Sequence, residues 1–147
     1  MPSSVKSVPQ DSKQKAISAA QAALEKKASD VVILEVAELT SVADYFVIAS
    51  GESERQVKAI AQNIEKLISS QFNRSAQIEG ACTSTWILLD YGDIIVHIFK
   101  TDIREYYGLE KMWSDAPQIL IPEQESPASL QPQYAKGAQT RGARYGS

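Results

Sequence analysis

The sequence is poor in the residues that many enzyme and metal sites require. Its 147 residues include one cysteine, Cys82, and one histidine, His97. A single thiol excludes a disulfide framework and a zinc site built from several thiolates. A single histidine excludes a histidine triad and any site with two histidine ligands. The function is therefore expected to depend on other side chains.

Long apolar runs and net positive charge are also lacking. No run approaches the roughly 18 to 20 apolar residues of a membrane-spanning helix, and residues 1–14 lack the apolar stretch of a secretory signal. The formal charge of −3 argues against DNA binding through a positive field. We therefore expect a soluble protein in a reducing compartment, with no membrane association. An organelle is the alternative, because no acid precedes Asp11 in the Ser- and Lys-containing N-terminus.

Charge and composition divide the chain into three parts. The last 22 residues carry three cations and no acid, which leaves −6 on the rest of the chain. This segment has several Pro and Gly residues and few aliphatic side chains, so it cannot bury enough surface to offset its ordering entropy. We predict a flexible segment over 1–12, one domain over 13–121, and a flexible basic tail over 122–147. The tail is read as a linker remnant, with a weak RNA contact as the alternative.

Hydrophobic periodicity predicts the elements of this domain. A first helix should bury Ile17, Ala20, Leu24 and Ala28, and a longer helix should follow a capping box of Ser53 and Gln56. Apolar runs predict strands over 31–36, 45–49, 86–90 and 94–99, the last two joined by a tight turn. A last helix should start at Asp102, capped by Thr101, and run to about Trp113 with a possible break at Gly108.

The order α-β-β-α-β-β-α indicates an α/β fold, a single domain with a mixed sheet and flanking helices. The strands are almost continuously apolar, so helices should cover more than one side of the sheet.

Few residues point to catalysis. His97 lies within an apolar strand and is read as a structural histidine rather than a base. Asp90 and Asp93 flank the turn as D-Y-G-D, where they could share a magnesium ion or hydrogen-bond the backbone of the turn, the favoured interpretation. Cys82 is read as a passive residue, and Ser50 to Ser53 as an ordinary helix start rather than a phosphate loop.

Aromatic residues are concentrated in the last third of the domain. Trp86, Tyr91, Tyr106, Tyr107 and Trp113 alternate there with charged residues. Trp, Tyr and Arg anchor many protein–protein contacts because they bury much area at low entropic cost. Adjacent Tyr106 and Tyr107 cannot both face the core equally. The pattern favours a protein-binding surface slightly over a plain aromatic core.

These residues also resemble a known family. The segment Trp86–Phe99 (WILLDYGDIIVHIF), with Arg104, Tyr107, Leu109–Glu110 and Trp113–Asp115 after it, is similar to the Iojap-like ribosomal silencing factors. Glu79-Gly80, Asp44–Gly51 and Arg55–Val57 match the same pattern. The resemblance covers nearly the whole domain.

The resemblance implies a nucleotidyltransferase-like fold and a non-enzymatic protein without a cofactor. Its partner would be the large ribosomal subunit, bound through large-subunit ribosomal protein fourteen. This contact would block joining of the small subunit and repress translation when nutrients are scarce. Family members often form homodimers. The ribosome-contacting surface would centre on two aromatic residues and five neighbours or supports: Trp86 and Tyr91, then Asp90, Asp93, Arg104, Tyr107 and Trp113.

Two other functions stay open on the residues alone. The same aromatic surface would suit an adaptor for a non-ribosomal partner. A divergent magnesium-dependent nucleotidyltransferase using Asp90 and Asp93 is the weaker alternative, because the chain contains no Asp-x-Asp pair. In addition, residues three apart on a continuous strand would face opposite sides.

Overall fold

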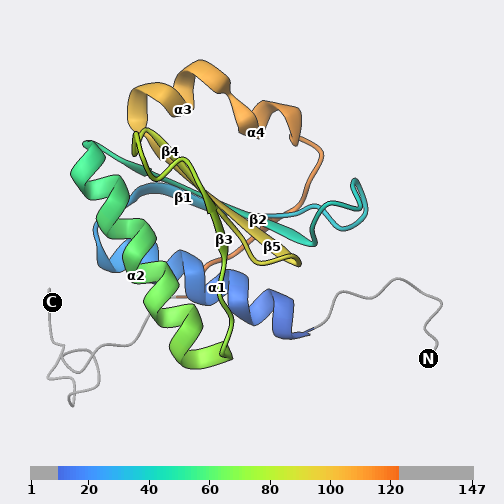
Figure 1. The fold of residues 1–147 in the computed structure, drawn as a ribbon. Helices are drawn as coiled ribbons and strands as arrows, with labels where there is room; N and C mark the ends of the chain where they lie inside the picture. The colour runs from blue at the N-terminus through green and yellow to red at the C-terminus, as the bar shows by residue number, and fades with distance from the viewer. Residues whose placement is uncertain (1–9, 123–147) are drawn as a thin grey trace, which may run out of the picture.

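A six-stranded mixed sheet organises residues 10–122, the part of the chain that this computed structural model describes (Figure 1). The elements in chain order are α1 (Gln10–Glu25), β1 (Ser29–Glu35), β2 (Tyr45–Gly51), α2 (Glu54–Phe72), β3 (Gln77–Glu79), β4 (Trp86–Asp90), β5 (Ile94–Lys100), α3 (Thr101–Tyr107), α4 (Leu109–Met112) and β6 (Gln118–Ile119). The predicted flexible tail, apart from Pro122, and residues 1–9 of the predicted N-terminal segment lie outside the described residues.

The strands lie in the order β3-β4-β5-β2-β1-β6. β2 and β5 are parallel neighbours at the centre, and the other pairs are antiparallel. The predicted single α/β domain with a mixed sheet is thereby confirmed. β3 and β6 are additions to the predicted order, because strands of three and two residues are too short to give a periodic pattern.

Helices cover both faces of the sheet, as the apolar strands predicted. Figure 1 shows α1 and α2 on one face and α3 and α4 on the other. The first face buries the larger core, which includes Val47, Ile64 and Ile98. The second face buries a smaller core around Phe46 and Phe99. The alternating side chains of β1, β2, β4 and β5 therefore contribute to two different cores.

Helix α1 packs through alanine rather than through its larger side chains. It begins at Gln10, so residues 10–12 belong to the helix and not to the predicted flexible segment. Five alanines are fully buried on it, namely Ala16, Ala19, Ala20, Ala22 and Ala23. Leu24, which was expected on the buried face, is 46% exposed, so that part of the prediction was wrong. Small side chains let the helix axis approach the sheet closely.

The caps of the other helices follow the sequence in part. Ser53 accepts a hydrogen bond from the Gln56 backbone N–H at 3.1 Å, which confirms the predicted cap of α2. The Gln56 side chain in turn accepts from the Glu52 N–H at 2.7 Å. Thr101 does not cap α3 as predicted. It lies inside the helix, and its hydroxyl donates to the Gly51 carbonyl at 3.1 Å.

Gly108 separates α3 from α4. Its φ of +56° lies in the left-handed region, where a side chain would be strained, and its N–H donates to the Arg104 carbonyl at 2.9 Å. The break that the sequence suggested at this residue is confirmed. α3 and α4 follow one another across the same face of the sheet (Figure 1).

Candidate protein-binding surface

Trp86 lies at the start of β4 on the face that carries α3 and α4. Alternation along this strand sends Ile87 and Leu89 into the larger core. Trp86 and Leu88 point to the opposite face and are only partly buried. The Trp86 ring stacks on Phe99 with ring centroids 4.8 Å apart. The sheet therefore holds the indole from below while part of it stays accessible.

Tyr107 from α3 lies against the same indole. The two ring centroids are 5.0 Å apart, and 52% of Tyr107 is exposed. Tyr106 beside it is 81% exposed, so neither of the adjacent tyrosines is buried. We call Trp86, Leu88 and Tyr107 the β4–α3 surface.

A shallow groove continues this surface toward the edge of the sheet. It has a volume of about 220 Å³ and is lined by Glu79, Gly80, Trp86 and Leu88. Gly80 has a φ of +85°, and a Cβ there would lie 2.0 Å from the Trp86 carbonyl oxygen. Only glycine therefore allows β3 to approach β4 so closely. Glu79 and Asp90 are the acidic side chains nearest to the groove along β3 and β4.

His97 lies beneath Trp86 and is 6% exposed. The indole Nε1–H of Trp86 donates a hydrogen bond to His97 Nδ1 at 3.3 Å. The imidazole also meets Phe46 edge-on, with ring centroids 5.2 Å apart. Burial lowers the pKa of His97 to about 4, so the ring is neutral at pH 7. The predicted structural histidine is confirmed, with the indole as its hydrogen-bond partner.

Trp113 supports the second core rather than extending the β4–α3 surface. It lies just after α4 and is partly buried, with its ring perpendicular to Phe46 and centroids 5.1 Å apart. Trp113 contacts Phe46, and Phe46 in turn contacts His97. Trp113 therefore acts on the surface indirectly, through the core below it.

Arg104 ties α3 to α4 and to β2. The residue is 7% exposed, and its guanidinium donates to both carboxylate oxygens of Glu110, with the shortest contact 2.6 Å. It also donates to the Ser50 hydroxyl at 2.7 Å. The hydrogen bonds from Arg104 outweigh burial and lower the pKa of Glu110 below its usual value. Arg104 is therefore a support of the α3–α4 unit and not an exposed contact.

Replacing Glu110 with Gln is expected to loosen this support. The variant loses the charge of the pair but keeps the shape, and because 39% of the Glu110 side chain is exposed, water offsets part of the loss. We expect the free energy of unfolding to fall by about 1 kcal/mol. Urea unfolding of both proteins measures it. Equal midpoints would show that the pair contributes nothing.

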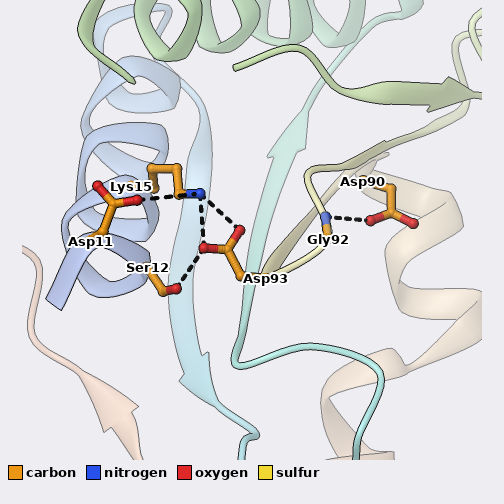
Figure 2. A network of polar contacts seen from close by, with 6 residues as sticks. All are labelled: Asp11, Ser12, Lys15, Asp90, Gly92 and Asp93. Atoms are coloured by element: carbon orange, nitrogen blue, oxygen red, sulfur yellow. Dashed lines mark hydrogen bonds and ion pairs between the residues drawn. The ribbon is translucent and has the colours of Figure 1, made fainter. Parts of the chain in front are cut away.

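The two aspartates of the D-Y-G-D turn face different partners. Figure 2 shows Asp90 accepting from the Gly92 N–H, at 2.8 Å, and Asp93 facing α1. There Lys15 donates to Asp93 at 2.9 Å, and Ser12 donates to the other carboxylate oxygen. The turn interpretation is confirmed for Asp90, whereas the contact of Asp93 with α1 was not predicted. Within residues 10–122, no group of three or more His, Cys, Asp or Glu residues is arranged to hold a metal ion.

Burial at Asp93 by itself would raise the pKa of its carboxyl group. The hydrogen bonds from Lys15 and Ser12, and the positive charge of Lys15, outweigh that effect and lower the pKa below its usual value. Lys15 is fully buried and has a second, longer contact to exposed Asp11 at 3.7 Å. The cluster therefore fastens α1 to the β4–β5 turn.

Tyr91 is buried in the larger core, on the face opposite to Trp86. Its exposed fraction is 8%, and its hydroxyl has no hydrogen-bond partner within the described range 10–122. Burial first, and then the charge of Glu65, raises the pKa of Tyr91. The sequence had grouped Tyr91 with Trp86 as a surface residue, but the structure places the two on different faces.

The seven predicted site residues thus separate into three groups. The structure brings Trp86 and Tyr107 together on the β4–α3 surface, with Asp90 on the same face of β4. Arg104 and Trp113 support that surface from the second core. Asp93 and Tyr91 belong to the side of α1 and α2. Leu88 was missed as a surface residue, although its position two residues after Trp86 on the strand was a usable signal.

An accessible aromatic pair on a mixed sheet, beside a groove lined by Glu79, is typical of the class of protein-binding α/β domains and makes this surface a candidate of that class. In the described part of the chain, no helix is both long and apolar enough to cross a membrane.

Comparison with known proteins agrees with this class. Residues 9–145 match the family model described as ribosomal silencing factor during starvation. The chain is 42% identical over 99 residues to the ribosomal silencing factor RsfS of Bacillus subtilis, covering 67% of this chain and 84% of that protein. It is 36% identical over 107 residues to the chloroplastic protein Iojap of Zea mays, covering 73% of this chain and 46% of that protein.

A solved structure from Bacillus halodurans has the same fold. It superposes with a TM-score of 0.63 at 37% identity and covers 76% of this chain and 99% of that one. The chain therefore belongs to the RsfS family of Iojap-like ribosomal silencing factors, as its sequence motifs had predicted.

Proposed function

We propose that this protein binds the large ribosomal subunit through large-subunit ribosomal protein fourteen and blocks joining of the small subunit. The observation that carries this proposal is the accessible Trp86–Tyr107 pair on a rigid sheet in a member of the silencing-factor family. Steric prevention of subunit joining requires only that a folded protein occupies the face of the large subunit that meets the small subunit. Translation would be repressed without catalysis, and the regulation would matter most under nutrient limitation.

Charge favours the same kind of partner. Glu79 lines the groove beside Trp86, Asp90 lies at the other end of β4 on the same face, and the chain without its last 22 residues carries −6. Ribosomal proteins that contact RNA are commonly basic, and complementary charge raises the association rate more than the affinity. This activity requires a compartment with bacterial-type ribosomes, namely the bacterial cytoplasm or an organelle.

Sedimentation of purified subunits tests the proposal. Large and small subunits are mixed with the protein at a magnesium concentration that normally couples them. We expect the protein to sediment with the large subunit and to reduce the coupled particle. Binding to neither subunit, with coupling unchanged, would contradict the ribosomal function and favour an adaptor for another partner.

Variants of the aromatic pair locate the contact. Tyr107→Ala and Trp86→Ala are each expected to weaken large-subunit binding by about 2 kcal/mol, roughly 30-fold in Kd, if they anchor the interface. Leu24→Ala is a matched control, because Leu24 is 46% exposed on α1, across the sheet from Tyr107. Thermal melting of each variant separates lost contacts from lost folding. Equal losses for Tyr107→Ala and Leu24→Ala would place the interface elsewhere.

A further inference from the structure

The buried imidazole of His97 lies diagonally across from Trp86 on neighbouring strands. In the β4–β5 register Trp86 is opposite Phe99, and Leu88 is opposite His97. All four side chains contact the second core and so share one face of the sheet. Diagonal cross-strand neighbours lie within reach of long and aromatic side chains. This arrangement explains how His97 Nδ1 reaches the indole N–H.

The other nitrogen of His97, Nε2, carries the proton of the ring. Neutral imidazole carries one proton, and because Nδ1 accepts from Trp86, that proton is on Nε2. His97 Nε2 is buried without a hydrogen-bond partner among the described residues. An unpaired buried donor opposes folding. A phenylalanine at this position would fill similar space next to Phe46 and Phe99 without a buried unpaired donor of its own. It would also remove the acceptor of the Trp86 indole N–H, but Trp86 is only partly buried, which limits that cost.

Stability alone therefore does not account for a histidine here. We propose that His97 is a positioning residue for the β4–α3 surface, which fixes the orientation of the Trp86 indole through its Nδ1 acceptor. The inference rests on the proposed function, because it assigns His97 a role in the same ribosome-binding surface. Phe99 stacks beneath the indole and Tyr107 lies beside it, but neither ring contact fixes rotation as a directional hydrogen bond does. Holding the indole in its bound orientation lowers the entropy lost on binding.

Two substitutions of His97 separate the role of its hydrogen-bond acceptor from the packing of its ring. His97→Phe keeps an aromatic ring but removes the acceptor. His97→Asn can place its side-chain oxygen near the position of Nδ1 but loses most of the ring. We expect His97→Phe to melt at or above the wild-type temperature and to bind the large subunit roughly fivefold more weakly. We expect His97→Asn to melt at a lower temperature and to bind within about twofold of wild type, measured where it is folded.

The indole N–H provides a readout that is independent of the ribosome. In a Trp113→Phe background, the remaining Trp86 indole N–H is observed by NMR after ¹⁵N labelling of tryptophan. In this background, exchange of the indole N–H with solvent should be slow when residue 97 is the native histidine or is replaced by His97→Asn. It should be clearly faster in His97→Phe. Tyr107→Phe is the matched control, because it alters the neighbouring ring but leaves the Nδ1 acceptor in place.

The outcomes distinguish the two proposals. Wild-type binding of His97→Phe, or binding losses that follow the melting temperature in both variants, would overturn the role of His97. If wild-type protein does not bind the large subunit, the proposed function fails. The exchange of the indole N–H then decides alone whether His97 holds Trp86, and equal rates in wild type and His97→Phe would overturn it.

Discussion

Asp93→Asn is expected to lower the free energy of unfolding by about 3 kcal/mol. The substitution keeps the shape of the side chain but leaves the fully buried Lys15 ammonium without its carboxylate partner. Removing one member of a buried ion pair leaves the other charge unpaired in the protein interior, which solvates it poorly. The remaining contact to Asp11 is longer, at 3.7 Å, and Asp11 is exposed, so it replaces little of the lost interaction. Urea unfolding at pH 7 measures the change.

The matched partner variant is Lys15→Met. It should cost less than Asp93→Asn, because 25% of the Asp93 side chain is exposed and water can solvate the remaining carboxylate. The double variant should be more stable than the sum of the single effects predicts, since neither charge is then left alone. Additive effects would show that Lys15 and Asp93 do not interact energetically.

The pH dependence follows from the lowered pKa of Asp93. A carboxyl group whose pKa is lower in the folded state stabilises the protein above the unfolded pKa, near the ordinary value of 3.8. That stability is lost as the pH falls through the lower pKa of the folded state. The difference between wild type and Asp93→Asn should therefore be constant near neutral pH and shrink below about pH 4. A difference that instead shrinks between pH 6 and 8 would contradict the assignment to Asp93.

Local sequence signals predicted the elements that depend on neighbouring residues. The cap at Ser53, the D-Y-G-D turn and the break at Gly108 each involve contacts within a few residues. Alternation along β4 places Trp86 and Ile87 on opposite faces. The accessible position of Trp86 was inferred from the concentration of aromatic residues and from the family resemblance. These features can be predicted because they depend on residues that are close together in the sequence.

Contacts between distant segments could not be predicted in this way. Lys15 and Asp93 are 78 residues apart, and nothing near Lys15 in the sequence distinguishes it from a solvated lysine. The error at Leu24 has a related reason: the buried face of α1 consists mainly of alanines, which give a weaker hydrophobic signal than Leu24, whereas Ile17, Ala20 and Ala28 do pack on the larger core as predicted. The separation of Tyr91 from Trp86, by contrast, was predictable. The two residues are five apart, and alternation along β4 puts Tyr91 on the face of Ile87 and Leu89.

Tyr91→Ala is expected to lower the free energy of unfolding by about 3 to 5 kcal/mol, the range for truncating a buried aromatic residue. Tyr91 packs between β4 and the helices of the first face, so its loss leaves a cavity in the larger core. Weaker ribosome binding by this variant would follow from unfolding and would not identify a contact. Thermal and urea unfolding measure the loss directly.

Tyr91→Phe separates the core role from a surface role. The variant removes only the buried hydroxyl, which has no hydrogen-bond partner among residues 10–122. Its stability should therefore equal or slightly exceed that of wild type, and its binding to the large subunit should be unchanged, because Tyr91 faces away from Trp86. A folded Tyr91→Phe protein with clearly weaker binding would show that the hydroxyl contacts the partner after all. Together with Tyr107→Ala, the pair tests which side of the sheet faces the ribosome.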